Sequence, residues 1–154
     1  MGASQMGASQ GDWHFQPAYR LLQALERGKT SSAELVDYFQ SRAETHNPAL
    51  NAIVDQDFSA AKAQAEAADA ARKRGQNWGP LHGLPMTIKD ALEVAGMKAV
   101  GGAPQFAGHR PTRHAEAVQR IVNAGAIIFG KTNVPFLPAI FRPIMRSMAR
   151  RTIP

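Results

Sequence analysis

The sequence contains no cysteine. This absence excludes disulfide bonds, thiolate metal sites and a cysteine nucleophile. Long apolar runs are also missing, because no stretch approaches the roughly 18 residues that a membrane-spanning helix needs. The N-terminus has no basic region followed by an apolar core, which is the pattern of a secretory signal. We therefore expect a cytoplasmic protein that has no membrane partner.

Acidic residues are absent from the end of the chain. The 18 lysines and arginines outnumber the 12 aspartates and glutamates, which gives a formal net charge of +6. Residues 139–154 hold four of the arginines and no acidic residue, so this tail accounts for most of the excess. A charge excess confined to a tail is not typical of a nucleic-acid-binding domain, and we expect no nucleic-acid partner. Nucleic-acid binding through the tail alone stays open as an alternative.

The length of 154 residues suits one domain, and its first half is predicted to be mostly helical. An apolar helical face is followed by Gly28, which is placed to end that helix. Ser31 and Glu34 have the spacing of a capping box and predict the start of a second helix. We expect Asn47-Pro48 to stop this second helix. The alanine-rich residues 58–74 favour a third helix by propensity.

Short apolar runs in the chain are predicted to be strands. Leu84–Ile88 and residues 126–129 are bounded by turn residues, and residues 52–54 are a third candidate. Between the first two lie an irregular stretch at 95–113, rich in glycine and proline, and a predicted helix at 114–124. The order strand, helix, strand predicts a right-handed crossover in an α/β sheet. The residues of this helix expected to face inward are Ala117, Val118, Ile121 and Val122.

One segment, Gly79-Pro-Leu-His-Gly-Leu-Pro-Met-Thr-Ile-Lys-Asp90, has a distinctive pattern. It resembles the hallmark of the amidase signature family, which is Gly-Pro-Leu-His-Gly-(Ile/Leu)-Pro, a few apolar residues and then Lys-Asp. Asn47-Pro48-x-Leu50-Asn51-Ala52 and Gly125-Ala-Ile-Ile-x-Gly-Lys-Thr-Asn133 also resemble the family, and the similarity covers roughly residues 17 to 138. The resemblance implies the N-terminal portion of an α/β/α fold with a mixed central sheet. It also implies hydrolysis of carbon–nitrogen bonds in a small-molecule amide, without a cofactor or metal.

The resemblance places Lys89 in the family's Ser–cis-Ser–Lys triad, a variant of serine-hydrolase chemistry. The neutral amine would take a proton from the nucleophilic serine by way of the bridging serine. A solvated lysine titrates near pH 10.4, so a lysine base at pH 7 needs a pKa lowered by roughly 3 units, which burial at a strand end can provide. From its position alone, the same lysine could be an edge charge that reaches water. We interpret His82 as structural, and Asp90 as a support for the turn or the lysine, or as a salt-bridge partner.

A second motif, Gly125-x-x-x-x-Gly130-Lys131-Thr132, matches the phosphate-binding P-loop literally. A P-loop requires a flexible loop between its glycines and a helix after its threonine. Here Ala-Ile-Ile-Phe favours a strand between the glycines, and Pro135 and Pro138 oppose a following helix. We interpret the match as accidental and keep nucleotide binding as an alternative.

The sequence has no counterpart of the Gly/Ser-rich segment in which the family carries its nucleophile. The only serine after Lys89 is Ser147, which has no glycine-rich context. We therefore expect an inactive fragment that keeps the lysine and lacks both catalytic serines. A non-catalytic chain that associates with another subunit is the alternative.

The resemblance stops near Pro138 and predicts three segments. Residues 1–16 form a disordered N-terminus that repeats Met-Gly-Ala-Ser-Gln, residues 17–138 a partial amidase domain, and residues 139–154 a basic tail unrelated to the family. A frameshift would account for the tail, because its permitted codons can encode Tyr-Gly-Thr-Thr-Asn-Asn-Pro in another frame. That run resembles what the family carries just before its serine segment. The coding DNA downstream of codon 138 tests this hypothesis.

Overall fold

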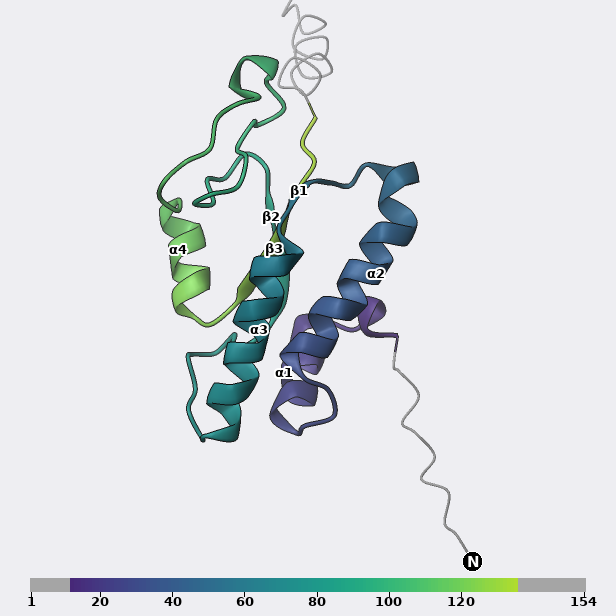
Figure 1. Ribbon diagram of the computed structural model, residues 1–154, viewed down its shortest axis with the longest axis vertical. Helices are drawn as coiled ribbons and strands as arrows, with labels where there is room; N and C mark the ends of the chain where they lie inside the picture. Colours follow the sequence, from purple (N-terminus) through teal and green to yellow (C-terminus); the bar gives the residue numbers. More distant parts are fainter. Residues whose placement is uncertain (1–11, 136–154) are drawn as a thin grey trace, which may run out of the picture.

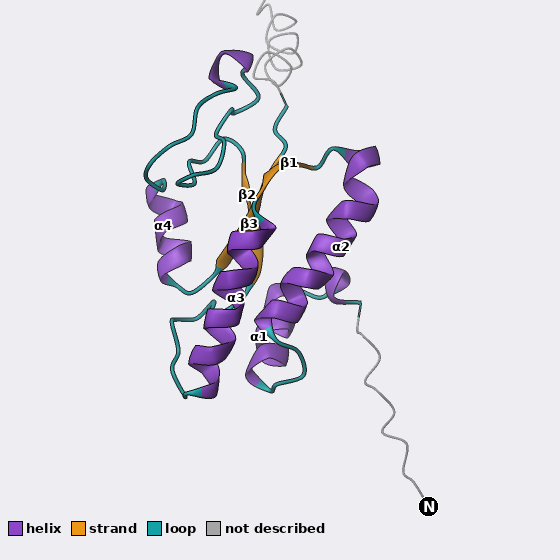
Figure 2. Ribbon diagram, viewed as in Figure 1, coloured by secondary structure: helices purple, strands orange, loops and turns teal. Residues whose placement is uncertain are grey.

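The computed structural model describes residues 12–135, which alternate between helices and strands (Figures 1 and 2). In chain order the elements are the 3-10 helix η1 (Trp13–Phe15), α1 (Ala18–Glu26), α2 (Ser32–Leu50), β1 (Ile53–Gln56), α3 (Phe58–Lys73), β2 (Pro85–Lys89), the 3-10 helix η2 (Pro104–Phe106), α4 (Glu116–Asn123) and β3 (Ile127–Thr132). Within this range, no helix has both the length and the apolar character required to cross a membrane.

The three strands form one mixed sheet in the order β1-β3-β2, with the last strand of the chain in the middle. β2 runs parallel to β3, as the predicted strand–helix–strand unit requires, whereas β1 runs antiparallel to β3. The register places Ile88 beside Lys131 and Lys89 beside Thr132. Two lysines from distant parts of the sequence therefore lie at the same end of neighbouring strands.

Helices pack on both faces of the sheet. α2 and α3 pack against each other and against β3, where Val36, Ile127 and Phe129 belong to one buried core. Side chains alternate along a strand, so the intervening Ile128 faces the other side, and there it packs in a second cluster with Val118 of α4. Figure 1 shows α3 lying across the strands and α4 apart from it at the side of the sheet. The mixed sheet with helices on both faces confirms the predicted α/β class.

The predicted start of α2 is confirmed. Ser31 Oγ accepts a hydrogen bond from the Glu34 backbone N–H at 3.1 Å, and Glu34 Oε2 accepts one from the Ser31 N–H at 2.8 Å. These reciprocal bonds satisfy two of the backbone donors that a helix start otherwise leaves without partners.

The predicted end of α2 is wrong by about one turn, because the helix continues through Pro48 to Leu50. Proline removes only its own backbone donor, and the next turn closes without it: Asn51 N donates to Asn47 O at 2.7 Å. The helix ends instead at Asn51, which has the left-handed backbone conformation with φ 48°.

The helix before β3 also differs in detail from its prediction. It begins at Glu116 rather than His114, because His114 Nδ1 accepts a hydrogen bond from the Ala95 N–H at 3.1 Å and so belongs to the preceding loop. Ala117 is exposed and not inward-facing, since the buried stripe of α4 is centred on Val118.

Candidate active site

Polar residues gather where β2 and β3 end. Lys89 and Asp90 close β2, while Lys131 and Asn133 stand at the end of β3. In α/β sheets the carboxyl ends of parallel strands form the usual ligand-binding edge. This end of the sheet is therefore the candidate active site.

Lys89 is exposed in the part of the chain that the structure describes. Its Nζ donates a hydrogen bond to the main-chain oxygen of Asn133 at 3.0 Å. The burial expected for a lysine base is therefore not provided by residues 12–135. This hydrogen bond nevertheless orients the Lys89 amine toward Asn133, the residue that directly follows β3.

Lys131 has the opposite environment and is fully buried. Its Nζ donates to the main-chain oxygen of Lys98 at 2.7 Å and lies 3.7 Å from Asp90 Oδ1. Burial lowers the pKa of Lys131, and the negative charges of Asp90, Asp55 and Glu93 oppose this effect. The buried lysine at this end of the sheet is thus Lys131, which the sequence singled out only as part of the P-loop match.

Asp90 supports a loop and pairs with Lys131, not with its neighbour Lys89. Its carboxylate accepts hydrogen bonds from the N–H groups of Val100 at 3.3 Å and Gly101 at 2.8 Å. Asp90 is only 3% exposed, so these contacts and the Lys131 ion pair satisfy a charge that water does not reach. The salt-bridge interpretation of Asp90 is therefore confirmed, with Lys131 as the partner. The hydrogen bonds of Asp90 support the loop at Val100 and Gly101, and not the adjacent turn or Lys89 as the sequence suggested.

His82 is structural, as interpreted from the sequence. Its Nδ1 accepts from the Trp78 N–H at 2.8 Å, which leaves the proton on Nε2 for the main-chain oxygen of Ala68 at 2.9 Å. The following residue must be glycine, since a Cβ on Gly83 would lie 2.1 Å from Ser32 Oγ. These contacts fasten the turn before β2 to α2 and α3, and so fix where the strand begins.

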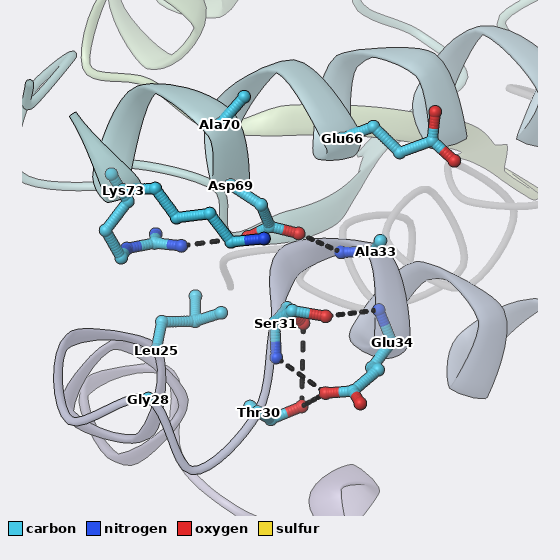
Figure 3. A pocket seen from close by; sticks show the side chains of 11 residues that line it. Leu25, Gly28, Thr30, Ser31, Ala33, Glu34, Glu66, Asp69, Ala70 and Lys73 are labelled. Carbon is cyan, nitrogen blue, oxygen red and sulfur yellow. Dashed lines mark hydrogen bonds and ion pairs between the residues drawn. The ribbon is translucent and has the colours of Figure 1, made fainter.

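A hollow of about 670 Å³ lies between the start of α2 and the second half of α3 (Figure 3). Lys89, Asp90, Lys131 and Asn133 do not line it. Asp69 on its wall accepts from the backbone N–H groups of Ser32 and Ala33, at 2.8 and 3.0 Å. Ser31, Glu34 and Asp69 in this lining are engaged in capping α2. Since the hollow also includes none of the residues at the strand ends, we do not assign it to the chemistry.

The P-loop match is accidental. β3 runs from Ile127 to Thr132, so the residues that would cradle a phosphate are a central strand of the sheet. No helix begins between Thr132 and Pro135, where the described residues end, and the Lys131 amine is buried. The geometry contradicts the nucleotide-binding alternative.

Comparison with known proteins assigns the fold to a family. The model of the Amidase family matches residues 34–139, more than half of the sequence. The chain belongs to the amidase family. The stretch around Lys89 lies inside the match, and the resemblance in the sequence is confirmed.

Relatives and solved structures agree with this assignment. A glutamyl-tRNA(Gln) amidotransferase subunit from Synechococcus sp. (strain CC9605) is 38% identical over 112 residues, which are 73% of this chain and 23% of the relative. The native peptide amidase of Stenotrophomonas maltophilia superimposes with a TM-score of 0.74 at 29% identity, over 80% of this chain and 26% of that one. A structure described as an amidase gives a TM-score of 0.70 at 35% identity, over 79% and 28% of the two chains. The chain thus spans about a quarter of the length of the amidase-family proteins it matches and has the partial α/β/α fold that the resemblance implied.

Sequence reasoning placed Lys89 at a strand end correctly but missed the Lys131–Asp90 pair. The pair depends on the parallel register of β2 and β3, which joins residues 41 positions apart. One signal was available in the sequence. Only Gly130 separates Lys131 from the apolar run Ala126–Phe129, so a buried strand that extends through Gly130 would place the lysine in the protein interior.

Proposed function

We propose that this chain carries the lysine-bearing part of an amidase that hydrolyses carbon–nitrogen amide bonds, with Lys89 as the proton acceptor. The observation that carries the proposal is the position of Lys89. It closes a strand at the ligand-binding edge of the sheet, within the sequence that matches the amidase family. Lys131, the other lysine of this edge, is committed to Asp90 and to a main-chain oxygen.

The chemistry requires two further groups. A serine alcohol attacks the amide carbonyl while its proton passes through a second serine to the neutral lysine amine. The carbon–nitrogen bond then breaks, the proton returns to the nitrogen of the leaving amine, and water hydrolyses the acyl-enzyme that remains. The printed 154 residues have no Gly/Ser-rich segment after Lys89, so we propose that they do not turn over amides by themselves. In the complete arrangement Lys89 accepts and returns the proton, and further chain covers its exposed amine.

A chimaera tests the proposal directly. Residues 12–138 of this chain replace the corresponding part of the Stenotrophomonas maltophilia peptide amidase, and hydrolysis of a peptide amide is measured. We expect activity in the chimaera and a loss of about 10²- to 10⁴-fold in kcat with Lys89→Ala, the usual effect of removing a general acid–base group.

Two results would contradict the proposal. An active chimaera that Lys89→Ala leaves unchanged would remove Lys89 from the chemistry. Hydrolysis of a simple aryl amide by the purified 154-residue chain, abolished by Lys89→Ala, would show that the chain needs no further serine segment.

A non-catalytic role in an assembly is the second candidate. It is favoured by the relatives whose names describe one subunit of an amidotransferase, since such a name implies further subunits. Co-purification of a defined partner with the tagged chain at constant stoichiometry would support it. Recovery of the chain alone would leave the first proposal.

Three other expectations remain predictions. The segment boundaries at residues 16 and 138, the frameshifted tail and the absence of a nucleic-acid partner, with binding through the tail as its alternative, concern residues that lie wholly or partly outside the described range. A cytoplasmic location is likewise a prediction.

A further inference from the structure

We propose that three asparagines, Asn47, Asn51 and Asn133, form a positioning device for Lys89, here named the asparagine corner. It acts through a single main-chain oxygen, that of Asn133, which accepts from Lys89 Nζ at 3.0 Å. The inference rests on the proposed function of Lys89. It gives a role to two sequence motifs that the chemistry left unused, Asn47-Pro48-x-Leu50-Asn51 and the asparagine after Gly130-Lys131-Thr132.

Asn133 is held at two points by the junction between α2 and β1. Its backbone N–H donates to Ala52 O at 2.9 Å, and its side-chain Nδ2 donates to Asn51 O, also at 2.9 Å. The second bond spans 82 positions of sequence. Because both bonds end on consecutive carbonyls of one turn, Asn133 cannot rotate without breaking at least one of them.

Asn51 presents its carbonyl through an unusual backbone conformation. Among the described residues it is the only one other than glycine with a positive φ, 48°. Asparagine tolerates this left-handed region better than most residues, which explains its use at the end of α2. The conformation turns the chain sharply from α2 into β1.

Asn47, near the end of α2, stabilises the same turn through its side chain. Its Oδ1 accepts from the Ile53 N–H, and its Nδ2 donates to the Ile53 carbonyl, both at 2.8 Å. Its main-chain oxygen accepts from the Asn51 N–H at 2.7 Å. The three asparagines therefore connect the end of α2, the start of β1 and the end of β3, and the chain of bonds terminates at the Lys89 amine.

A main-chain oxygen is a suitable partner for a proton acceptor. A carbonyl accepts a hydrogen bond from either an ammonium or a neutral amine, whereas a carboxylate favours the ammonium. The nearest carboxylate in sequence, that of Asp90, is held by Val100, Gly101 and Lys131 instead. The corner can thus orient the amine in both of its protonation states.

The test measures the order of the Lys89 side chain in the 154-residue protein, by ¹³C relaxation of its Cε methylene at neutral pH. Lys89→Arg assigns the signal, and the exposed Lys73 is the internal reference. We expect Lys89 to be more ordered than Lys73. Asn133→Ala, which deletes the Nδ2 bond, should lower the ratio of held to free Lys89 by about two- to tenfold, the usual weight of one hydrogen bond.

The matched control is Asn51→Gly. It keeps the carbonyl that accepts from Asn133 and a backbone that favours the left-handed conformation, so Lys89 should keep its order. If Asn133→Ala does not fold, Asn133→Leu keeps a side chain of similar size and removes the donor amide without adding a charge, with the same expected loss of order.

Two outcomes overturn the inference: a wild-type Lys89 as mobile as Lys73, or a Lys89 whose order the folded Asn133 variants leave unchanged. Neither measurement depends on amide hydrolysis. A failure of the corner is therefore distinct from a failure of the proposed function, which the chimaera tests.

Discussion

Lys89 and Lys131 stand at the same end of adjacent parallel strands and differ in almost every physical respect. Among residues 12–135, Lys89 is exposed and has one hydrogen-bond partner, the neutral main-chain oxygen of Asn133 at 3.0 Å. Lys131 is fully buried between Asp90 and the main-chain oxygen of Lys98. The residue that follows Lys89 in sequence is thus the ionic partner of a lysine that lies in the neighbouring strand.

The difference indicates a structural role for Lys131 and leaves Lys89 as the lysine that is accessible from outside the described residues. Burial alone would select Lys131 as the functional amine, because desolvation lowers its pKa. Its nitrogen is nevertheless surrounded by protein acceptors and has no route to a substrate among residues 12–135. Lys131 holds the loop after β2 at Lys98, whereas Lys89 is exposed and donates to the main-chain oxygen of Asn133.

The largest expected effect is on stability and comes from Lys131→Met. This substitution leaves Asp90 as a buried charge without its counter-ion, which typically costs about 3–5 kcal/mol of unfolding free energy. Urea denaturation followed by circular dichroism measures the loss. The double variant with Asp90→Asn should recover much of it, and a single variant as stable as the wild type would refute the structural role of the pair.

A smaller loss is expected from Gly102→Ala, which disturbs the loop that covers Lys131. Gly102 has φ +70°, and a Cβ there would lie 3.0 Å from Pro135 O. The backbone strain and the contact together should cost about 2–3 kcal/mol. Gly101→Ala is the matched control, because its φ is +59° but its Cβ meets nothing within 4 Å, so equal losses would show that the contact is unimportant.

A dependence of stability on pH follows from the lowered pKa of Lys131. Between the pKa of Lys131 in the folded protein and its ordinary value of 10.5, the unfolded chain binds more protons than the folded one, so this lysine makes stability rise with pH in that window. Below the folded pKa its contribution no longer changes. Urea midpoints measured from pH 7 upward should rise more steeply in the wild type than in the Lys131→Met/Asp90→Asn variant. Parallel curves would mean that Lys131 titrates like a solvated lysine.

The smallest expected effect on stability belongs to Lys89→Met. Only one exposed hydrogen bond is lost, so the unfolding free energy should change by about 1 kcal/mol or less. The same urea titration measures it. A loss as large as that of Lys131→Met would abolish the distinction between the two lysines.

Local features of this fold could be predicted from the sequence. The capping box of Ser31 and Glu34 and the strand before Lys89 depend on residues close together in the chain. The predicted end of α2 at Asn47-Pro48 was wrong because proline removes only its own backbone donor, and the last turn of the helix closes through the Asn51 N–H instead. The helix ends at Asn51, whose left-handed conformation the sequence pattern did not indicate.

The candidate site was only half predictable. The position of Lys89 follows from its motif, but the Lys131–Asp90 pair and the bond from Asn133 to Asn51 join residues 41 and 82 positions apart. Such pairs depend on strand order and register, which local patterns leave undetermined. The antiparallel placement of β1 beside β3 is of the same kind, and it is what brings the α2–β1 junction to the edge that carries Lys89.

The most direct test of the account is kcat for peptide amide hydrolysis by the chimaera that carries Lys89→Met, measured together with its unfolding midpoint. We expect kcat to fall at least about 100-fold while the midpoint stays near that of the parent chimaera, because the proposed function gives Lys89 a role in proton transfer and none in the fold. A folded variant that retains most of its turnover would contradict the assignment of Lys89.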